Sequence, residues 1–420
     1  MGRSVFAMLV LLGACAEPTL GTETSEISTQ VRHERYALIR DSAAEMGMYN
    51  AALLAGIAIS ETNLAHCQSE ATYACQGPPS PSCGGGPIIA GSADGPCSAQ
   101  QGGLGMFQFD SGTYAQTLAT YGDSILTIEG NTAQAVNFVT ERAMLDIDEA
   151  KDWLSTMNWL NQVDMDASKA TMQEWASFIV CRYNGCCSSS STCITRANGY
   201  RDHAIQAFEE MGADFWRTSN RCTGIPADGV IDQRSTCYIA GGDPRYWHRE
   251  TGGVDDTREW TGTTSNNAPA NFGQWIIKAP KAGRYTVDVN LDGGELGTSK
   301  TASYVIVHAG MTDTVLVDQT SASGWVSLGE FDFAGSGDEH VLLGDNTGEA
   351  SSSAQVMFDA IRVLSPDQDP GDPSDPDDPD DMAAAGCCGT GRGTGPTSLV
   401  GVALFGWITR RRGSTTRRRA

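Results

Sequence analysis

The cysteines place the strongest constraint on how this chain can fold. Of 13 cysteines in 420 residues, eight lie from Cys67 to Cys193, and Cys222 and Cys237 follow them. An even number of cysteines clustered in one segment is typical of disulfides in an exported protein. A zinc site is disfavoured, because this segment holds no C-x-x-C pair and its cysteine spacings are irregular.

We therefore expect five disulfides, with four in the first part of the chain and one joining Cys222 to Cys237. The sequence does not choose among the pairings of the first eight cysteines. Those eight are Cys67, Cys75, Cys83, Cys97, Cys181, Cys186, Cys187 and Cys193.

The N-terminus also indicates export. Residues 1–15 carry an early Arg3 and an apolar run from Val5 to Leu12, which is typical of a secretory signal. Residues 12–15 resemble a bacterial lipobox, in which Cys15 is acylated and becomes the mature N-terminus. The alternative is an ordinary small-x-small cleavage site that overlaps the same residues.

The C-terminal residues predict a flexible tether followed by a second targeting signal. Residues 366–385 are rich in Asp and Pro and cannot bury a core. Residues 386–420 combine Gly-Cys-Cys, a short apolar stretch and two Arg triplets, which resembles the C-terminal sorting tag of myxobacterial surface proteins. The alternative is a weak single-pass anchor with a positive cytoplasmic flank. Either way, the body of the protein is expected outside the cytoplasm, in the cell envelope, at the cell surface or secreted.

Roughly 330 residues between these ends suggest two domains. We expect a linker over 16–34, a helical domain over 35–220 and a β-rich domain over 221–365, an α+β multidomain chain. The net charge of −23 argues against nucleic acid as a partner.

Apolar residues recur at helical spacing in the first domain. We expect helices at 51–61, capped by Asn50, at a capping box formed by Thr171–Glu174, and at 196–211. Residues 68–103 show no periodicity and predict a long, disulfide-pinned loop. The inward stripe of the last helix comprises Tyr200, Ala204, Phe208 and Met211.

The second domain shows short alternating segments with Gly-rich turns, which favours an antiparallel β-sandwich. The predicted strands are 285–289, 304–308, 314–317, 325–328, 340–343 and 356–364.

Glu61 is the first candidate for chemistry. It ends an apolar stripe on the helix 51–61, where desolvation raises a carboxyl pKa toward the value that a general acid needs. The alternative is a glutamate that points into solvent at a helix end.

Three segments together resemble the lytic transglycosylase and goose-type lysozyme superfamily. They are Ile59–Asn63, Gly103–Phe109 and Cys181–Cys186, in this order, and the resemblance covers roughly residues 35 to 215. It implies a mainly helical, lysozyme-like domain that cleaves peptidoglycan without a metal or an organic cofactor.

The resemblance also implies roles for single residues. Glu61 would be the catalytic acid/base, Gln108 would line the sugar groove, Tyr183 would hydrogen-bond the glutamate and Asn184 would shape the cleft. Arg182 stands where the family has a small residue, and if it faced Glu61 it would lower the pKa of that carboxyl.

Two further residues have competing interpretations. Asp110 is either a second carboxylate that positions water or, as we prefer, a helix cap. His66, five residues after Glu61, is expected to be structural.

The β-rich domain resembles the carbohydrate-binding-like domain at the C-terminus of golvesin and of xanthan lyase. The matching segments include Gly273–Trp275, Pro280–Val287 and Phe358–Val363, and the resemblance spans roughly 228 to 365. It implies a binding or structural module. Tyr246, Trp247 and Trp260 lie in its early loops, where they either stack on sugar rings or fill the sandwich core. Trp275 and Trp325 are expected in the core.

The sequence thus predicts an exported peptidoglycan-cleaving glycosidase with a glycan-binding sandwich. Its partners would be peptidoglycan or a related glycan, and the membrane through the N-terminal lipid or the C-terminal tag. The alternatives are a non-catalytic surface protein that binds glycan and a glycosidase that acts on chitin or another polysaccharide.

Overall fold

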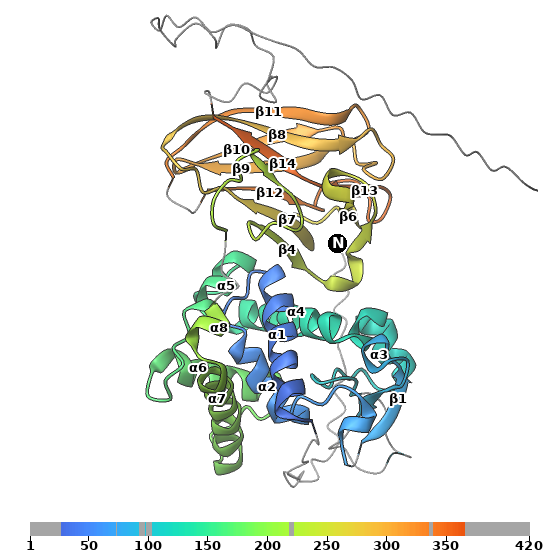
Figure 1. Ribbon diagram of the computed structural model, residues 1–420, viewed down its shortest axis with the longest axis vertical. Coiled ribbons are helices and arrows are strands. Elements are labelled where there is room, and N and C mark those ends of the chain that lie inside the picture. Colours follow the sequence, from blue (N-terminus) through green and yellow to red (C-terminus); the bar gives the residue numbers. More distant parts are fainter. Residues whose placement is uncertain are drawn as a thin grey trace, which may run out of the picture. The chain divides into compact units, whose positions relative to one another are not determined.

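The computed structural model describes residues 27–72, 74–91, 97, 103–217, 222–335 and 339–365. The expected signal with Cys15, the acidic tether and the C-terminal tag lie outside these residues. In the described part, a mainly helical domain precedes an antiparallel β-sandwich, which confirms the predicted α+β, multidomain fold (Figure 1). Among the described residues, no helix is both long and apolar enough to span a bilayer.

The helical domain begins earlier than the sequence suggests. The first helix starts at Thr29, where the Ser28 hydroxyl accepts a hydrogen bond from the Val31 amide at 3.3 Å. Residues 29–34, which we expected in the linker 16–34, are therefore helical. The helices described in this domain are α1 (Thr29–Glu45), α2 (Ala52–Thr62), α3 (Tyr114–Tyr121), α4 (Ile128–Asp146), α5 (Trp153–Asn161), α6 (Ala170–Arg182), α7 (Ser191–Met211) and α8 (Ala213–Arg217).

Helix α2 lies in the core of this domain and contacts α1, α4 and α7. Its residues from Ala52 to Ile59 are all buried, as expected for a helix that is apolar on every side. Helix α7 approaches closely at Gly56, where an added Cβ would lie 2.6 Å from the Ala204 Cβ. The last turn of α2, which carries Glu61, is therefore held against α7.

Both predicted helix caps are wrong, because the side chains of Asn50 and Thr171 bond to other groups. The Asn50 amide donates to the carbonyls of Leu160 at 3.1 Å and Val163 at 2.9 Å, and Ala51 stands at the start of α2. The Thr171 hydroxyl lies inside the first turn of α6 and accepts from the Asp164 amide at 3.1 Å.

The segment 68–103, predicted as a loop, contains a small antiparallel hairpin. Its strands are β1 (Cys75–Pro79) and β2 (Pro87–Ala90). The strands are short and rich in Gly and Pro, so they carry no readable alternation. Two disulfides, Cys67–Cys83 and Cys75–Cys97, hold the hairpin.

Two further disulfides interlock around the turn between α6 and α7. They join Cys181 to Cys187 and Cys186 to Cys193. With the bridge from Cys222 to Cys237, the structure has four disulfides in the helical domain and one at the start of the β-rich domain. This arrangement is typical of a protein that folds in an oxidising compartment.

The β-rich domain consists of antiparallel sheets, and β11, β8 and β14 form one layer above β9 and β12 (Figure 1). One sheet has the order β10-β9-β12-β7-β4, another β11-β8-β14-β3, and a third β13-β6-β5. The strands are β3 (Val230–Ile231), β4 (Tyr238–Gly242), β5 (His248–Glu250), β6 (Arg258–Gly262), β7 (Asn271–Ile276), β8 (Gly283–Asp292), β9 (Ala302–His308), β10 (Met311–Val317), β11 (Ser323–Phe333), β12 (His340–Gly344), β13 (Gln355–Phe358) and β14 (Ile361–Leu364).

The sandwich core follows the alternation of the strands. Along β8, Tyr285, Val287 and Val289 are buried. Trp275 is fully buried, as predicted. Trp325 is not a core residue: it is half-buried, and the Arg362 guanidinium lies 4.7 Å from the centre of its ring.

Candidate functional site

Glu61 lies in the last turn of α2, just before the helix ends in a left-handed Asn63 (φ 52°). Its side chain is half-buried. The hydroxyl of Tyr200, on α7, donates a hydrogen bond to one oxygen of the Glu61 carboxylate. Tyr200 is only 4% exposed, so this contact forms at the rim of the core, where a carboxylate is partly desolvated.

The segment Gly103–Phe109 is fixed in place by one buried side chain of α4. The Asn131 carboxamide accepts from the Phe107 amide at 3.0 Å and donates to the Leu104 carbonyl at 3.3 Å. Gly105 (φ 74°) permits this approach, because a Cβ there would lie 2.5 Å from the Asn131 Nδ2. The Thr62 hydroxyl donates to the Met106 carbonyl at 3.1 Å, which ties this segment to the end of α2.

The third segment also reaches the second one. The Tyr183 hydroxyl donates to the carbonyl of Phe107, so the expected hydrogen bond from Tyr183 to Glu61 is replaced by one from Tyr200. Tyr183 nevertheless lies near Glu61: burial raises its pKa, and the negative charge of Glu61 raises it further. The three segments therefore meet around one carboxylate.

Asn184 lies in the turn after α6, between the two interlocked disulfides. Its Oδ1 accepts from the Arg196 guanidinium at 2.8 Å. The Asn184 side chain lies close enough to Tyr200 to oppose the rise that burial causes in the pKa of that tyrosine.

The remaining predicted site residues have local roles in the structure. Gln108 has a left-handed backbone (φ 52°), and its side-chain Nε2 donates to the Gly105 carbonyl at 2.7 Å. Arg182 pairs with Asp146, away from Glu61. His66 is fully buried, its Nε2 lies 3.1 Å from the Leu126 carbonyl, and burial lowers its pKa to about 4, which fits a structural role.

Asp110 does not cap the helix that follows it. Its Oδ1 accepts from the Gly112 amide at 2.7 Å, and the hydroxyl of Thr113 caps α3 instead. Asp110 therefore closes an exposed turn, in which the chain bonds to itself.

Sequence reasoning missed the role of Tyr200. The helical pattern did place Tyr200 on the inward stripe of its helix, but an inward tyrosine is usually core. The signal that distinguishes it is geometric: α7 crosses α2 where Gly56 permits a close approach, which brings the Tyr200 hydroxyl to the end of α2.

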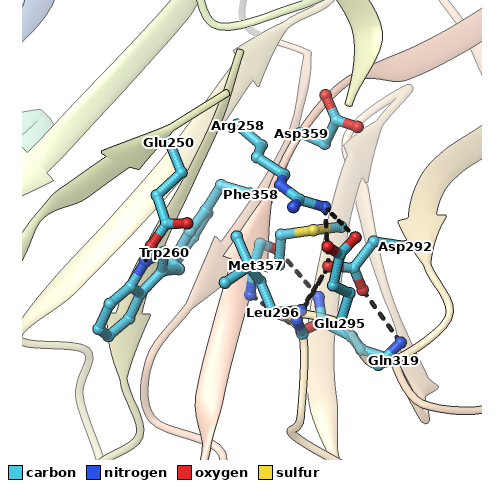
Figure 2. A network of polar contacts seen from close by, with 12 residues as sticks. Glu250, Arg258, Trp260, Asp292, Glu295, Leu296, Gln319, Met357, Phe358 and Asp359 are labelled. Atoms are coloured by element: carbon cyan, nitrogen blue, oxygen red, sulfur yellow. Dashed lines mark hydrogen bonds and ion pairs between the residues drawn. The ribbon is translucent and has the colours of Figure 1, made fainter. Parts of the chain in front are cut away.

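A second polar network lies in the sandwich (Figure 2). The Arg258 guanidinium contacts Asp292 and Glu295, each at 3.2 Å, and Asp292 accepts the Leu296 amide at 2.6 Å. These contacts order the loop after β8. Burial raises the pKa of the nearby Asp359 to about 6. Over the described ranges, no group of three or more His, Cys, Asp or Glu side chains is arranged to hold a metal ion.

On the same sheet, Trp260 stacks on His248, directly opposite it on β5. The ring centres are 4.0 Å apart and the planes differ by 19°. The Glu250 carboxylate accepts from the Trp260 indole N–H at 3.1 Å, as Figure 2 shows. His248 and Glu250 are exposed and Trp260 is half-buried. Of the other aromatic candidates, Tyr246 is 50% exposed, whereas Trp247 packs against Phe358.

No curated protein matches the chain. Among solved structures, the xanthan lyase of Paenibacillus is 16% identical with a TM-score of 0.28, over 32% of this chain and 13% of that one. A family 35 carbohydrate-binding module from Clostridium thermocellum is 16% identical with a TM-score of 0.23, over 32% of this chain and 98% of that one. Residues 231–365 match the family model described as the Golvesin C-terminal domain. The predicted resemblance of the β-rich domain is thereby confirmed: after its helical domain, the chain carries a region similar to the Golvesin C-terminal domain.

Proposed function

We propose that this protein is an exported glycosidase that cleaves peptidoglycan at the β-1,4 bond between N-acetylmuramic acid and N-acetylglucosamine. The observation that carries the proposal is the setting of Glu61. Three segments that resemble the motifs of lytic transglycosylases and goose-type lysozymes converge on this half-buried carboxylate, and a buried tyrosine holds it.

The chemistry needs a carboxyl group that can give and take one proton. Protonated Glu61 would donate to the glycosidic oxygen as the bond breaks and an oxocarbenium-like centre develops. The resulting carboxylate would then accept a proton, either from an attacking water or from a hydroxyl of the sugar itself. The first route gives a reducing end and the second a 1,6-anhydro end.

The test is a digest of purified peptidoglycan by the protein without its terminal address segments, followed by analysis of the fragments. Wild type should release muropeptides, and Glu61→Gln should release none above background. Asp110→Asn is the matched control, because it changes an exposed carboxylate on a neighbouring turn and should keep the activity. If Glu61→Gln cleaves as well as wild type, Glu61 is not the catalytic acid.

The β-rich domain would supply glycan binding. The surface that best fits a sugar ring is the Trp260–His248 pair, because an exposed flat aromatic surface with a polar rim is suited to the apolar face of a pyranose. Glu250 fixes the indole from one side and leaves its own second oxygen to contact hydroxyl groups.

One alternative is a protein that binds glycan but does not cleave it. A non-catalytic surface protein would use the β-rich domain alone, and the wild type would bind peptidoglycan without cutting it. Another alternative changes the polysaccharide: release of oligosaccharides from chitin, but not from peptidoglycan, would favour that substrate.

A further inference from the structure

Aromatic rings lie beside Glu61, and one of them belongs to α4. The Tyr183 ring packs edge-on against the Phe138 ring, with the ring centres 5.3 Å apart and the planes at 80°. Phe138 also contacts Phe109, with 6.5 Å between the ring centres. Because Tyr183 is close enough to Glu61 for that charge to raise its pKa beyond the effect of burial, Phe138 belongs to the surroundings of the candidate carboxylate.

Phe138 begins a row of side chains along α4. Arg142 follows it after four residues and Leu145 after three more, so the three share one face of the helix. Phe138 is half-buried, Arg142 is exposed and Leu145 is 70% exposed. We call these three residues the α4 stripe. It runs from the aromatic rings beside Glu61 outward to solvent.

Arg142 is the one basic residue in the sequence of α4. Its Cζ lies over the Phe138 ring, 5.1 Å from the ring centre, which is a cation–π distance. Such a contact uses the positive charge of the guanidinium and not its N–H donors, which lie in the guanidinium plane. Phe138 therefore orders the Arg142 head group without using its hydrogen bonds.

Among the described residues, no ion pair includes Arg142. Asp146, one turn further along α4, accepts from two nitrogens of Arg182 instead. Glu141 precedes Arg142, but successive helix residues project about 100° apart and do not share a face. Burial raises the pKa of Glu141, and the charge of Arg142 opposes that rise without an ion pair. On a chain with a net charge of −23, Arg142 thus presents an ordered cation to an anionic ligand.

Peptidoglycan offers groups that match the α4 stripe, and chitin does not. The sugar rings of both polymers are neutral and can pack an apolar face against an aromatic side chain. Peptidoglycan also carries stem peptides on the lactyl groups of its N-acetylmuramic acid, with alanine methyl groups and carboxylates. Two residues of extended peptide span about 7 Å, so a stem peptide on a sugar beside Phe138 can reach the outer part of the stripe. A guanidinium binds a carboxylate through two parallel N–H bonds.

We propose that the α4 stripe is a subsite for the stem peptide of a peptidoglycan strand. Arg142 pairs with a stem carboxylate, Phe138 holds Arg142 in place, and Leu145 packs against the alanine methyl groups. This inference rests on the proposed function, because it assigns peptide-bearing strands as the substrate class of the Glu61 site. Recognition then depends on a part of the substrate that lies outside the reacting bond.

The experiment measures binding, so that it does not depend on cleavage. The full protein with Glu61→Gln, which keeps the ligands intact, is titrated in a calorimeter with a peptidoglycan tetrasaccharide that carries its stem peptides. A second titration uses the same tetrasaccharide after an amidase has removed the peptides. Glycan binding by the sandwich contributes to both titrations, because the sugars are the same. The peptide-bearing ligand should bind about tenfold more tightly.

Variants of the stripe should reduce this preference in a fixed order. Arg142→Gln should lower it about fivefold, since the ion pair is lost. Arg142→Lys keeps the charge but not the planar pair of donors, so it should lower the preference by less. Leu145→Asn should lower it about twofold, and added salt should lower it in the parent protein but not in Arg142→Gln. Because Arg142 and Leu145 are exposed, these variants should melt at the temperature of the parent.

The matched control is Arg40→Gln. Arg40 also lies over an aromatic ring, 4.4 Å from the centre of Phe215, but it stands on α1 and outside the stripe. Arg40→Gln should keep the full preference for the peptide-bearing ligand. An equal loss of preference in Arg40→Gln and Arg142→Gln would overturn the assignment of the subsite.

The outcomes separate this inference from the proposed function. If the parent binds both ligands equally, or if Arg142→Gln keeps the preference, the subsite is wrong even if the wild type cleaves peptidoglycan. If the preference depends on Arg142 but the protein with Glu61 intact cleaves neither ligand, the subsite stands and the proposed function fails. An oligogalacturonide that binds through Arg142 more tightly than the peptide-bearing ligand would assign Arg142 to acidic sugars and overturn the stem-peptide subsite.

Discussion

Each domain contains a glutamate that accepts a hydrogen bond from a buried tyrosine, and the two sites differ in what else they hold. In the sandwich, Glu259 accepts from Tyr238 at 3.1 Å and from two nitrogens of Arg249 at 2.9 and 2.6 Å. In the helical domain, Tyr200 holds Glu61, while Arg182 pairs with Asp146 and Arg196 bonds to Asn184.

The difference fits a structural role for Glu259 and the proposed chemical role for Glu61. A guanidinium bound through two nitrogens offsets the charge of a carboxylate and fixes its place in the fold. A tyrosine hydroxyl orients a carboxylate without neutralising it. We therefore expect Glu259 to serve the fold and Glu61 to serve the proposed chemistry.

The largest test of this contrast replaces each glutamate by glutamine. Glu61→Gln should lower the rate of glycan cleavage by about 10²–10⁴-fold, because the amide cannot deliver a proton, and should leave the unfolding free energy nearly unchanged. Glu259→Gln should keep the cleavage rate and lower the unfolding free energy by about 1–2 kcal/mol. Cleavage assays and denaturant titrations on both variants measure this; a reversed pattern would contradict the contrast.

The stabilities of the two domains should also change in opposite directions on acidification, because each domain contains one buried titratable group with a shifted pKa. Burial lowers the pKa of His66 to about 4, so its neutral form stabilises the helical domain above pH 6.5, and this contribution is lost as the pH falls toward 4. Burial raises the pKa of Asp345 to about 6, so its contribution to the sandwich is present below pH 3.8 and is lost as the pH rises through 6. Each effect is on the order of 3 kcal/mol.

Calorimetry of two variants between pH 4 and 7 checks these signs. Acidification should destabilise the wild-type helical domain through His66, and His66→Gln should abolish that loss. Acidification should stabilise the wild-type sandwich through Asp345, and Asp345→Asn should abolish that gain. Identical pH slopes in the variants and the wild type would show that neither group titrates as its burial implies.

The interlocked disulfides predict an effect confined to the helical domain. Cys186→Ser combined with Cys193→Ser should lower its unfolding free energy by about 2 kcal/mol, since the ring is short, and should weaken cleavage while the sandwich keeps its own transition. Removing the Cys222–Cys237 bridge in the same way is the matched control and should spare cleavage. Equal losses of cleavage in both variants would show that the position of the bridges is irrelevant.

The smallest expected effect concerns glycan binding by the sandwich. Trp260→Ala should weaken the binding of soluble peptidoglycan fragments by about tenfold, since an aromatic stacking contact contributes roughly 1–1.5 kcal/mol. Trp325→Ala, which changes a half-buried tryptophan that stacks on Arg362, is the control and should keep the affinity. Isothermal titration calorimetry measures the affinity of both variants. A similar loss of affinity in Trp260→Ala and Trp325→Ala would contradict a specific role for Trp260.

The sequence predicts the sandwich better than the helical domain, and the reason is physical. Alternation along strands such as β8 and β9 depends on nearest neighbours only, so the pattern is readable without knowledge of the fold. The early strands β3 to β7 were not predicted, because short segments such as His248–Glu250 are exposed on every residue and show no alternation.

In the helical domain, the residues that depend on distant partners were the ones misjudged. Asn50 has the side chain of a helix cap, but it bonds to a carbonyl 110 residues away, which the chain brings near only after folding. Thr171 bonds to the amide of Asp164 in the loop just before its helix. Tyr183 and Tyr200 are both inward tyrosines, and which of them reaches Glu61 depends on the crossing of α2 and α7. Glu61 itself was identifiable because its local setting, at the end of an apolar helix, already singles it out.

The adjacent cysteines Cys186 and Cys187 have a consequence for how this part of the protein reaches its folded state. In a reducing cytoplasm all four cysteines of the α6–α7 turn remain thiols, and nothing covalent then orders Asn184. Oxidation after export can close the four in more than one pattern, and a pattern that pairs the neighbours with each other would leave the turn unlocked. We therefore expect that the export compartment must rearrange wrong pairings as well as oxidise thiols, and that a strain without disulfide isomerase accumulates molecules in which this turn is wrongly bridged.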